Sequence, residues 1–175
     1  MKSTGVIRRI DELGRIVIPK EIRKNLKIRE GDMLEIYIEE TRIILTKFEV
    51  LNDISTVAKK LVNIASNLLN KNIIITSLET VIASSKNIEK EYLNKELSNI
   101  VRTKIEERMD YYQTTKTNIG FIKDQTEDCL YYISPILASS DTIGAVILFD
   151  KNNITETDTL LIKMISSFLI KNVEE

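Results

Sequence analysis

The sequence predicts an α+β protein of two domains, a small β-rich domain over residues 1–50 and a larger mixed domain over residues 51–175. Three observations support this prediction. Basic residues concentrate in the first 29 positions, which hold nine Lys or Arg and three Asp or Glu. Short β-branched runs separated by turn residues fill residues 1–50. Beyond them, helical spacing of apolar residues alternates with strand-like runs.

Composition narrows the classes of function. The 175-residue chain is 43% apolar, enough for a globular core, and its apolar runs are too short to cross a bilayer. Its start lacks the apolar region of a signal peptide, so we expect a cytoplasmic protein. The chain has no histidine and one cysteine, Cys129, which excludes a disulfide framework and His-dependent catalysis or metal binding. We therefore expect no enzyme, metal or cofactor.

Charge is unevenly distributed along the chain. The net charge is −1, yet residues 1–29 carry +6 and residues 30–49 carry −4. A basic module on an acidic body is typical of a nucleic-acid footprint. A solvated charged face gives the same pattern, so charge alone leaves both readings open.

The first 26 residues contain two predicted strands and a short helix. Thr4–Ile10 is predicted as a strand, followed by a turn at Asp11–Gly14 whose glycine takes a conformation that other residues adopt poorly. Arg15–Ile18 is predicted as the second strand because it is β-branched. Pro19 suits the first position of the helix Lys20–Leu26, which has an apolar and a cationic stripe.

A hairpin is predicted to complete the first domain. After a turn at Arg29–Asp32, apolar and polar residues alternate in Leu34–Glu39, as in a half-buried strand. The tight connection Glu40–Thr41 leads into Arg42–Phe48, although it lacks the usual Gly or Asn. A unit of about fifty residues buries too little apolar surface alone, so we expect a symmetric dimer to complete its core.

A helix is expected to connect the domains. Asp53 can cap it, and it runs to about Leu69. Its apolar residues recur at spacings of three and four: Ile54, Val57, Leu61, Ile64 and Leu68. This stripe can pack within its own domain or pair with another chain, and the sequence leaves both open.

The middle of the second domain is predicted to contain a hairpin and a long helix. Asn72–Ser77 and Val81–Ser85 form the hairpin, and the helix extends from about Ile88 to Arg108. The polar stretch Asp110–Asn118 is predicted as a loop, followed by a short strand at Ile119–Ile122.

Two strands and a helix are predicted to close the chain. Leu130–Ala138 contains Pro135, which cannot donate to a ladder, so this strand is expected to lie at an edge of the sheet or to carry a bulge. Thr142–Phe149 is the most apolar strand. Thr155 and Asp158 form a predicted capping box for the last helix, whose apolar face is wide enough for a sheet and another subunit.

Few side chains of the second domain suggest chemistry. Cys129 is expected to be a buried strand residue because no histidine is present to activate it. Tyr111, Tyr112, Tyr131 and Tyr132 can line a pocket, but packing is the favoured interpretation. The sequence has no Gly-rich phosphate loop, and cofactor-binding residues stay unassigned.

The N-terminal stretch Met1–Lys24 resembles the DNA-binding domain of AbrB-type transition-state regulators. The resemblance rests on the turn Leu13-Gly14-Arg15 followed by a β-branched run and Pro19. In that family, two chains intertwine into a swapped-hairpin dimer. The resemblance implies four DNA-contacting residues: Arg8, Arg15, Arg23 and Lys24. It leaves Arg9 and Lys20 as outer contacts, and Lys24 suits a phosphate better than a base.

Residues 51–175 resemble a GAF domain in the predicted order of their elements, which is helix, two strands, helix, three strands and helix. A swapped-hairpin domain followed by a GAF domain is the arrangement of a family of sporulation regulators. Three segments resemble that family in sequence: Glu91–Lys95, Pro135–Ala138 and Ile143–Phe149. The resemblance implies a nucleoid-associated protein that binds double-stranded promoter DNA and activates some genes and represses others in the developing spore.

Self-association is expected at two places, as a dimer through residues 1–50 and a tetramer through the GAF-like domain and helix 53–69. Whether the GAF-like domain binds a small molecule stays open. The alternative function is an antitoxin-like DNA-binding interaction protein, since related swapped-hairpin domains serve in toxin–antitoxin pairs. Such antitoxins end in disordered tails, whereas this chain is predicted to end in a folded helix.

Overall fold

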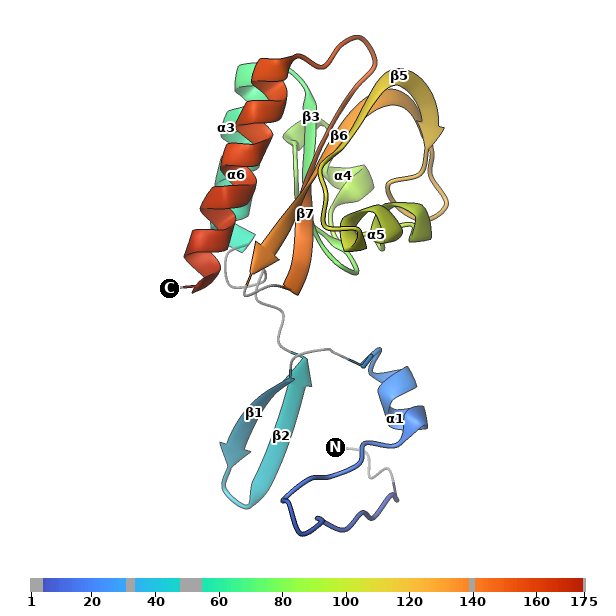
Figure 1. The fold of residues 1–175 in the computed structure, drawn as a ribbon, viewed down its shortest axis with the longest axis vertical. Helices are drawn as coiled ribbons and strands as arrows, with labels where there is room; N and C mark the ends of the chain where they lie inside the picture. Colours follow the sequence, from blue (N-terminus) through green and yellow to red (C-terminus); the bar gives the residue numbers. More distant parts are fainter. Residues whose placement is uncertain (1–4, 31–33, 48–54, 139–140, 175) are drawn as a thin grey trace. The chain divides into compact units, whose positions relative to one another are not determined.

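The computed structural model describes four segments of the chain: 5–30, 34–47, 55–138 and 141–174. The chain divides into two compact units, Met1–Phe48 and Glu49–Glu175 (Figure 1). Several residues of the predicted strands, turn and connecting helix lie outside the described residues: Thr4, Gly31, Asp32, Phe48, Asp53 and Ile54. None of the described helices has both the length and the apolar character that a membrane span requires.

The N-terminal unit contains a helix and a hairpin among its described residues. Helix α1 spans Lys20–Asn25, and strands β1 (Leu34–Glu39) and β2 (Arg42–Lys47) pair antiparallel through a two-residue connection. Because that connection has no glycine, Glu40 itself takes the positive φ of 51°. The predicted hairpin is confirmed over its described residues.

The strands predicted at Thr4–Ile10 and Arg15–Ile18 are not formed within one chain. Their described residues have no neighbouring strand, because β1 and β2 pair only with each other. A strand needs a second backbone to complete its hydrogen bonds, and the described residues of one copy offer none at these positions. The prediction was wrong for an isolated chain because it treated the β-branched pattern as sufficient.

A five-stranded sheet forms the centre of the C-terminal unit, in the order β4-β3-β7-β6-β5 and antiparallel throughout. The strands are β3 (Asn72–Ser77), β4 (Val81–Ser84), β5 (Tyr111–Ile119), β6 (Glu127–Ala138) and β7 (Asp141–Asp150). The helices are α3 (Ser55–Leu69), η1 (Lys86–Ile88), α4 (Glu89–Tyr92), α5 (Asn99–Glu106) and α6 (Glu156–Glu174). Helices α3 and α6 cover one face, and α4 and α5 cover the other (Figure 1).

Two hydrophobic cores lie on the two faces of this sheet. In β3, Ile73 and Ile75 belong to the core under α3 and α6, whereas Ile74 belongs to the core under α4 and α5. All three are fully buried. The alternation follows from the period of two in a strand, so a strand covered on both faces needs an unbroken apolar run. Each buried isoleucine contributes about 2 kcal/mol to stability.

The single helix predicted from Ile88 to Arg108 is wrong. The segment contains α4 and α5 with an extended stretch between them. Asn94 takes a positive φ of 61° just after α4. The N–H of Leu97 then donates to the carbonyl of Glu79 at 2.8 Å, a bond that a continuous helix would not leave available. Ser98 caps the start of α5 with its side chain.

The segment Asp110–Asn118, predicted as a loop, is largely strand β5. This strand lies at the edge of the sheet, pairs only with β6 and exposes most of its side chains. The sequence did not predict strand β5, because an edge strand with little burial needs no alternation of apolar and polar residues. The strand predicted at Ile119–Ile122 is also wrong, since Ile119 ends β5 and Ile122 forms only an isolated bridge.

Strand β6 lies between β7 and β5 and is not an edge strand, but it carries an irregularity near its proline, as the alternative prediction required. Pairing between β5 and β6 stops at Ile133, so Pro135 lies at a local edge and pairs with β7 alone. The ladder between β6 and β7 is also irregular just beyond the proline, between Ile136 and Leu137. Both features agree with a residue that has no N–H to donate.

Helix α3 packs on the sheet mainly through small residues. Ala58, Val62 and Ala65 are its buried positions. Two members of the predicted stripe, Ile64 and Leu68, are instead 66% and 72% exposed. That end of the stripe is therefore not used for packing within the domain.

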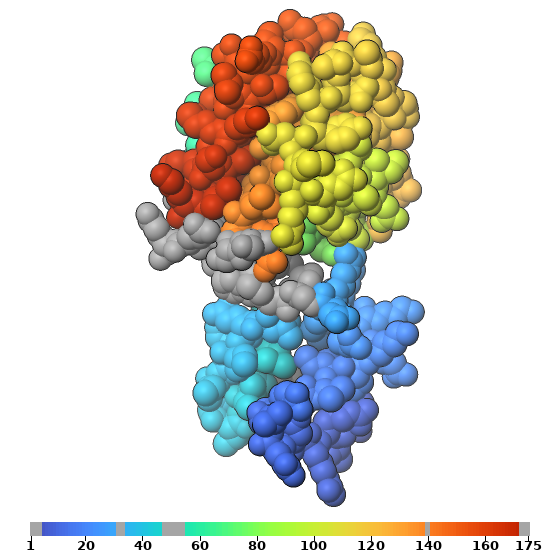
Figure 2. Space-filling model, in the orientation of Figure 1, coloured from blue at the N-terminus to red at the C-terminus, as the bar shows by residue number. Residues whose placement is uncertain are grey.

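Helix α6 begins with the predicted capping box. The N–H of Thr155 donates to Oδ2 of Asp158 at 2.6 Å, and the N–H of Asp158 donates to Oγ1 of Thr155 at 3.3 Å. Three of its apolar side chains are buried against the sheet: Ile162, Ile165 and Leu169. Three others are exposed: Leu160, Met164 and Phe168. Figure 2 shows α6, in red, along the outside of the C-terminal unit.

Candidate nucleic-acid interface

A compact turn carries Arg15, one of the predicted DNA contacts. The N–H of Asp11 donates to the carbonyl of Arg15 at 3.1 Å, and the N–H of Gly14 donates to the carbonyl of Asp11 at 3.0 Å. Gly14 takes a φ of 75°, a conformation that is inexpensive only for glycine. The predicted turn and the reason for its glycine are confirmed.

The Asp11 carboxylate holds this turn together and pairs with the arginine. It accepts hydrogen bonds from the backbone N–H groups of Leu13 and Arg15 and from Nε of Arg15. The backbone bond from Arg15, and then the bond from its side chain, lower the pKa of Asp11 below its ordinary value. The exposed Arg15 side chain is therefore oriented by an ionised partner within its own turn.

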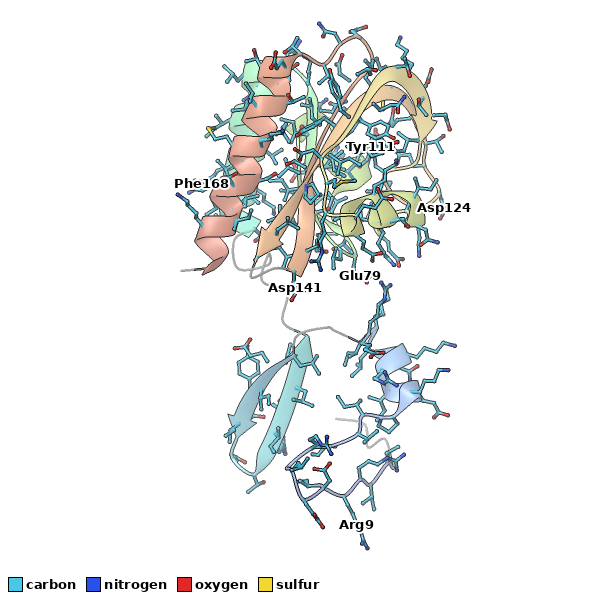
Figure 3. The ribbon with its side chains drawn as sticks, in the orientation of Figure 1. Arg9, Glu79, Tyr111, Asp124, Asp141 and Phe168 are labelled. Carbon is cyan, nitrogen blue, oxygen red and sulfur yellow. The ribbon has the colours of Figure 1, made fainter. Side chains whose placement is uncertain are left out.

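Arg8 and Arg9, the two arginines before the turn, are exposed. Arg8 donates from Nη1 to the carbonyl of Ile7 at 3.0 Å. The side chain of Arg9 points away from the chain at the tip of the N-terminal unit (Figure 3). These two arginines precede the turn, and Ile16–Ile18 separate the turn from α1.

Helix α1 carries the remaining predicted contacts. Pro19 precedes the helix as its N-cap, one position earlier than predicted, and Lys20 is the first helical residue. Lys20 and Lys24 are exposed, whereas Arg23 is half-buried. Nε of Arg23 is enclosed and has no hydrogen-bond partner among the described residues. An acceptor that reached this guanidinium would satisfy a donor that the described residues of one chain leave unpaired.

The same unit exposes its apolar residues. Among its described residues, none is buried. On the hairpin, Ile36 lies opposite Leu45 and Ile38 lies opposite Ile43, and all four are exposed, Ile38 by 82%. The segment before the turn adds Ile7, which is 87% exposed. An apolar face of this extent marks an interaction surface.

The distinctive side chains of the C-terminal unit serve packing. Cys129 is buried, and burial, followed by the charges of Glu127 and Asp128, raises the pKa of its thiol to about 12. Tyr131 stacks on Tyr111 with ring centroids 5.9 Å apart. The described residues contain no group of three acidic or cysteine side chains placed to hold a metal ion.

Sequence reasoning missed the second role of Asp11, which it treated only as a turn residue. An aspartate whose carboxylate accepts the backbone N–H two residues later is the signature of an Asx turn. That signal is present in the sequence, but the bond to the arginine side chain follows only from the three-dimensional turn.

Two protein-family models match the chain. Residues 53–174 match "Stage V sporulation protein T C-terminal, transcription factor". Residues 7–47 match "Antidote-toxin recognition MazE, bacterial antitoxin".

Two proteins of Bacillus subtilis (strain 168) are similar in sequence. Stage V sporulation protein T is 34% identical over 178 residues, which cover the whole of both chains. Transition state regulatory protein AbrB is 57% identical over 49 residues, which cover 28% of this chain and 51% of that protein. The predicted AbrB-like N-terminal domain is thereby confirmed.

Solved GAF domains resemble the C-terminal unit. The cofactor binding GAF domain of the nutrient sensor CodY from Clostridium difficile aligns with a TM-score of 0.51 at 13% identity, covering 73% of this chain and 99% of that chain. At this identity the likeness concerns the fold alone, and the predicted GAF-like fold is confirmed.

Proposed function

Because the chain belongs to the stage V sporulation protein T family, we propose that it is a DNA-binding transcription regulator of sporulation genes, active as a dimer. A transcription-factor family indicates a binding protein and not an enzyme. One observation carries the proposal most directly: the N-terminal unit exposes most of its described cations together with many of its apolar residues. A second copy of the chain would cover the apolar face and leave the cations for DNA.

We assign the DNA contacts to four residues: Arg8, Arg15, Arg23 and Lys24. Two copies present eight such groups, so the logarithm of the binding constant should fall with the logarithm of salt concentration with a slope of roughly −7. Arg9 and Lys20 add outer electrostatic attraction. The cationic helix α1 has only six residues, which is short for reading a groove, so sequence preference would rest largely on DNA shape.

Replacement of single cations tests this assignment. Arg15→Ala, or Arg8→Ala combined with Arg23→Ala, should abolish promoter binding at physiological salt while thermal unfolding stays cooperative. At low salt, Arg15→Ala should reduce the salt slope by roughly 2, one contact from each copy. Lys151→Ala, which removes an exposed cation from the C-terminal unit, is the matched control and should leave binding unchanged. Unchanged affinity of the Arg15→Ala variant would contradict the assigned surface.

Two such dimers would associate into a tetramer through the C-terminal units. Helices α3 and α6 lie side by side on one face of the sheet (Figure 1). Each carries exposed apolar residues four positions apart, Ile64 and Leu68 on α3 and Leu160 and Met164 on α6. Such a face supports helix–helix packing between copies.

Sedimentation of the full chain tests the tetramer. The double variant Leu68→Glu, Met164→Glu should sediment as a dimer that still binds DNA. Asn67→Glu, at an exposed polar position beside Leu68, should keep the mass of the wild type. If the double variant sediments as the wild type does, the association uses another surface.

A small-molecule signal would complete a sensor role for the GAF-like unit. The fold likeness supports this, and the described residues include an open polar depression of about 310 Å³. It is lined by Ser66, Asn67, Asn70, Lys71, Asn72, Lys86 and Asn87. A thermal-shift screen of nucleotides, amino acids and small acids against the full chain tests it. No stabilisation by any of them would favour a purely structural, tetramerising role.

An antitoxin-like interaction protein is the second candidate, favoured by the match of residues 7–47 to an antitoxin family model. The match of residues 53–174 to a transcription-factor domain, which forms a folded unit, favours the regulator instead. Stoichiometric co-purification of a small endonuclease from the native host would reverse this preference.

A further inference from the structure

The two oxygens of the Asp11 carboxylate have different partners. Oδ1 accepts from the backbone N–H of Leu13 at 3.0 Å and from the backbone N–H of Arg15 at 2.8 Å. Oδ2 accepts from Nε of the Arg15 side chain at 2.7 Å. One oxygen therefore shapes the turn, and the other oxygen holds the guanidinium.

A guanidinium held at Nε keeps a defined orientation. Arg15 has five N–H donors in a rigid planar fork, and the bond to Asp11 uses the one on Nε. Its two Nη groups have no hydrogen-bond partner among the described residues, so the outer edge of the fork is available for bidentate contact. The side chain is otherwise exposed and would lose rotamer freedom on binding if nothing had fixed it beforehand.

We propose that Asp11 is a positioning residue for DNA recognition, which aims the Nη edge of Arg15 at the nucleic acid. This inference rests on the proposed function. It runs against simple electrostatics, because a carboxylate beside a DNA-contacting arginine weakens the general attraction for phosphates. Asp11 would thus reduce binding to arbitrary sequences while it favours the one orientation that fits the target.

The substitution Asp11→Asn separates the two oxygens. Asparagine keeps an Oδ1 acceptor for the two backbone N–H groups, so the turn is retained. It replaces Oδ2 by an NH₂ group, which cannot accept from Nε of Arg15. The substitution removes one negative charge from each chain, so the net charge of the dimer rises by two. Affinity for promoter DNA should nevertheless fall roughly tenfold, and the preference for promoter over random duplex should fall with it.

Glu12→Gln is the matched control. Glu12 is the exposed neighbour of Asp11, so the substitution makes the same charge change one residue away. It should leave promoter affinity unchanged or raise it slightly. If Asp11→Asn also binds promoter DNA as tightly as the wild type, with unchanged preference over random duplex, the inference is overturned.

A double-mutant cycle distinguishes positioning from a general effect on folding. If Asp11 acts through Arg15, then at a low salt concentration at which the Arg15→Ala variant still binds DNA, Asp11→Asn should cause no further loss of promoter affinity in the Arg15→Ala background. Equal losses in both backgrounds would contradict the inference. If Arg15→Ala alone left promoter affinity unchanged, the proposed function would be contradicted instead. Failure of the inference and failure of the proposed function are therefore distinguishable.

Discussion

The Lys71 ammonium donates to Oδ2 of Asp158 and so joins the segment after α3 to the first turn of α6. Both side chains are buried, with exposed fractions of 9% and 6%. The same Asp158 oxygen also accepts the backbone N–H of Thr155 in the capping box. One carboxylate therefore closes the first turn of α6 and ties it to the connection between α3 and β3.

Lys71→Met should lower the free energy of unfolding of the C-terminal unit by about 3 kcal/mol, because it leaves a buried carboxylate without its cation. Urea unfolding measures this. Lys163→Met is the control. Lys163 pairs with Asp110 at 2.9 Å, and these side chains are 51% and 36% exposed, so its loss should cost less than about 1 kcal/mol. Similar losses for both variants would show that the buried pair contributes nothing special.

Acid should weaken the same unit through Asp158. Burial opposes ionisation, but hydrogen bonds from Lys71 and Thr155 outweigh it and keep the pKa of Asp158 below its ordinary value of 3.8. A lowered pKa stabilises the folded protein above the ordinary value, and this contribution is lost as pH falls through the folded-state pKa. Urea unfolding between about pH 7 and pH 3 should show a smaller decline for Asp158→Asn than for the wild type. Parallel declines would exclude this carboxylate as the source.

Gly14→Ala should destabilise the Arg15 turn by about 1 kcal/mol. An added Cβ meets no atom within 4 Å, so the whole effect comes from the positive φ of 75° and not from a clash. Promoter affinity and urea unfolding of the full chain measure it. Gly14→Asn is the control, because asparagine tolerates this conformation better, and it should fall between alanine and glycine. An alanine variant equal to the wild type would mean that the turn relaxes at no cost.

Ile38→Lys should abolish both dimerisation of the N-terminal unit and DNA binding. Ile38 is so exposed in one chain that a lysine there would disturb little without a second copy. Sedimentation and promoter binding measure the two effects. Thr41→Lys, at an exposed position in the hairpin turn, should change neither. A DNA-binding Ile38→Lys dimer would place the interface elsewhere.

The parts of the fold that local chemistry determines could be predicted from the sequence. The two hairpins, the Gly14 turn and the capping box of α6 each depend on residues within a few positions of one another. The break between α4 and α5 could not be predicted, because the apolar residues of this segment recur at nearly helical spacing across the break. Four of them pack into the same core: Tyr92, Leu97, Val101 and Ile105. Hydrogen bonds to segments distant in the sequence decide against a single helix, among them the bond from Leu97 to Glu79.

The candidate site divides in the same way. Residue type and the resemblance pointed to the cations, whose roles as DNA contacts stay predictions. The enclosure of Arg23 and the bond between Asp11 and Arg15 were not predicted. Both depend on the three-dimensional positions of side chains, which the sequence pattern does not give. Strand β5 was not predicted because its exposed polar residues do not show the alternating pattern of a strand.

The lack of a buried side chain among the described residues of the N-terminal unit has a consequence for gene control. If that unit acquires its core only by pairing, the amount of the form that binds promoters follows the square of the total protein at low expression. A doubling of synthesis would then raise this form roughly fourfold until pairing saturates. Target genes would respond to the regulator as a threshold and not in proportion to its dose.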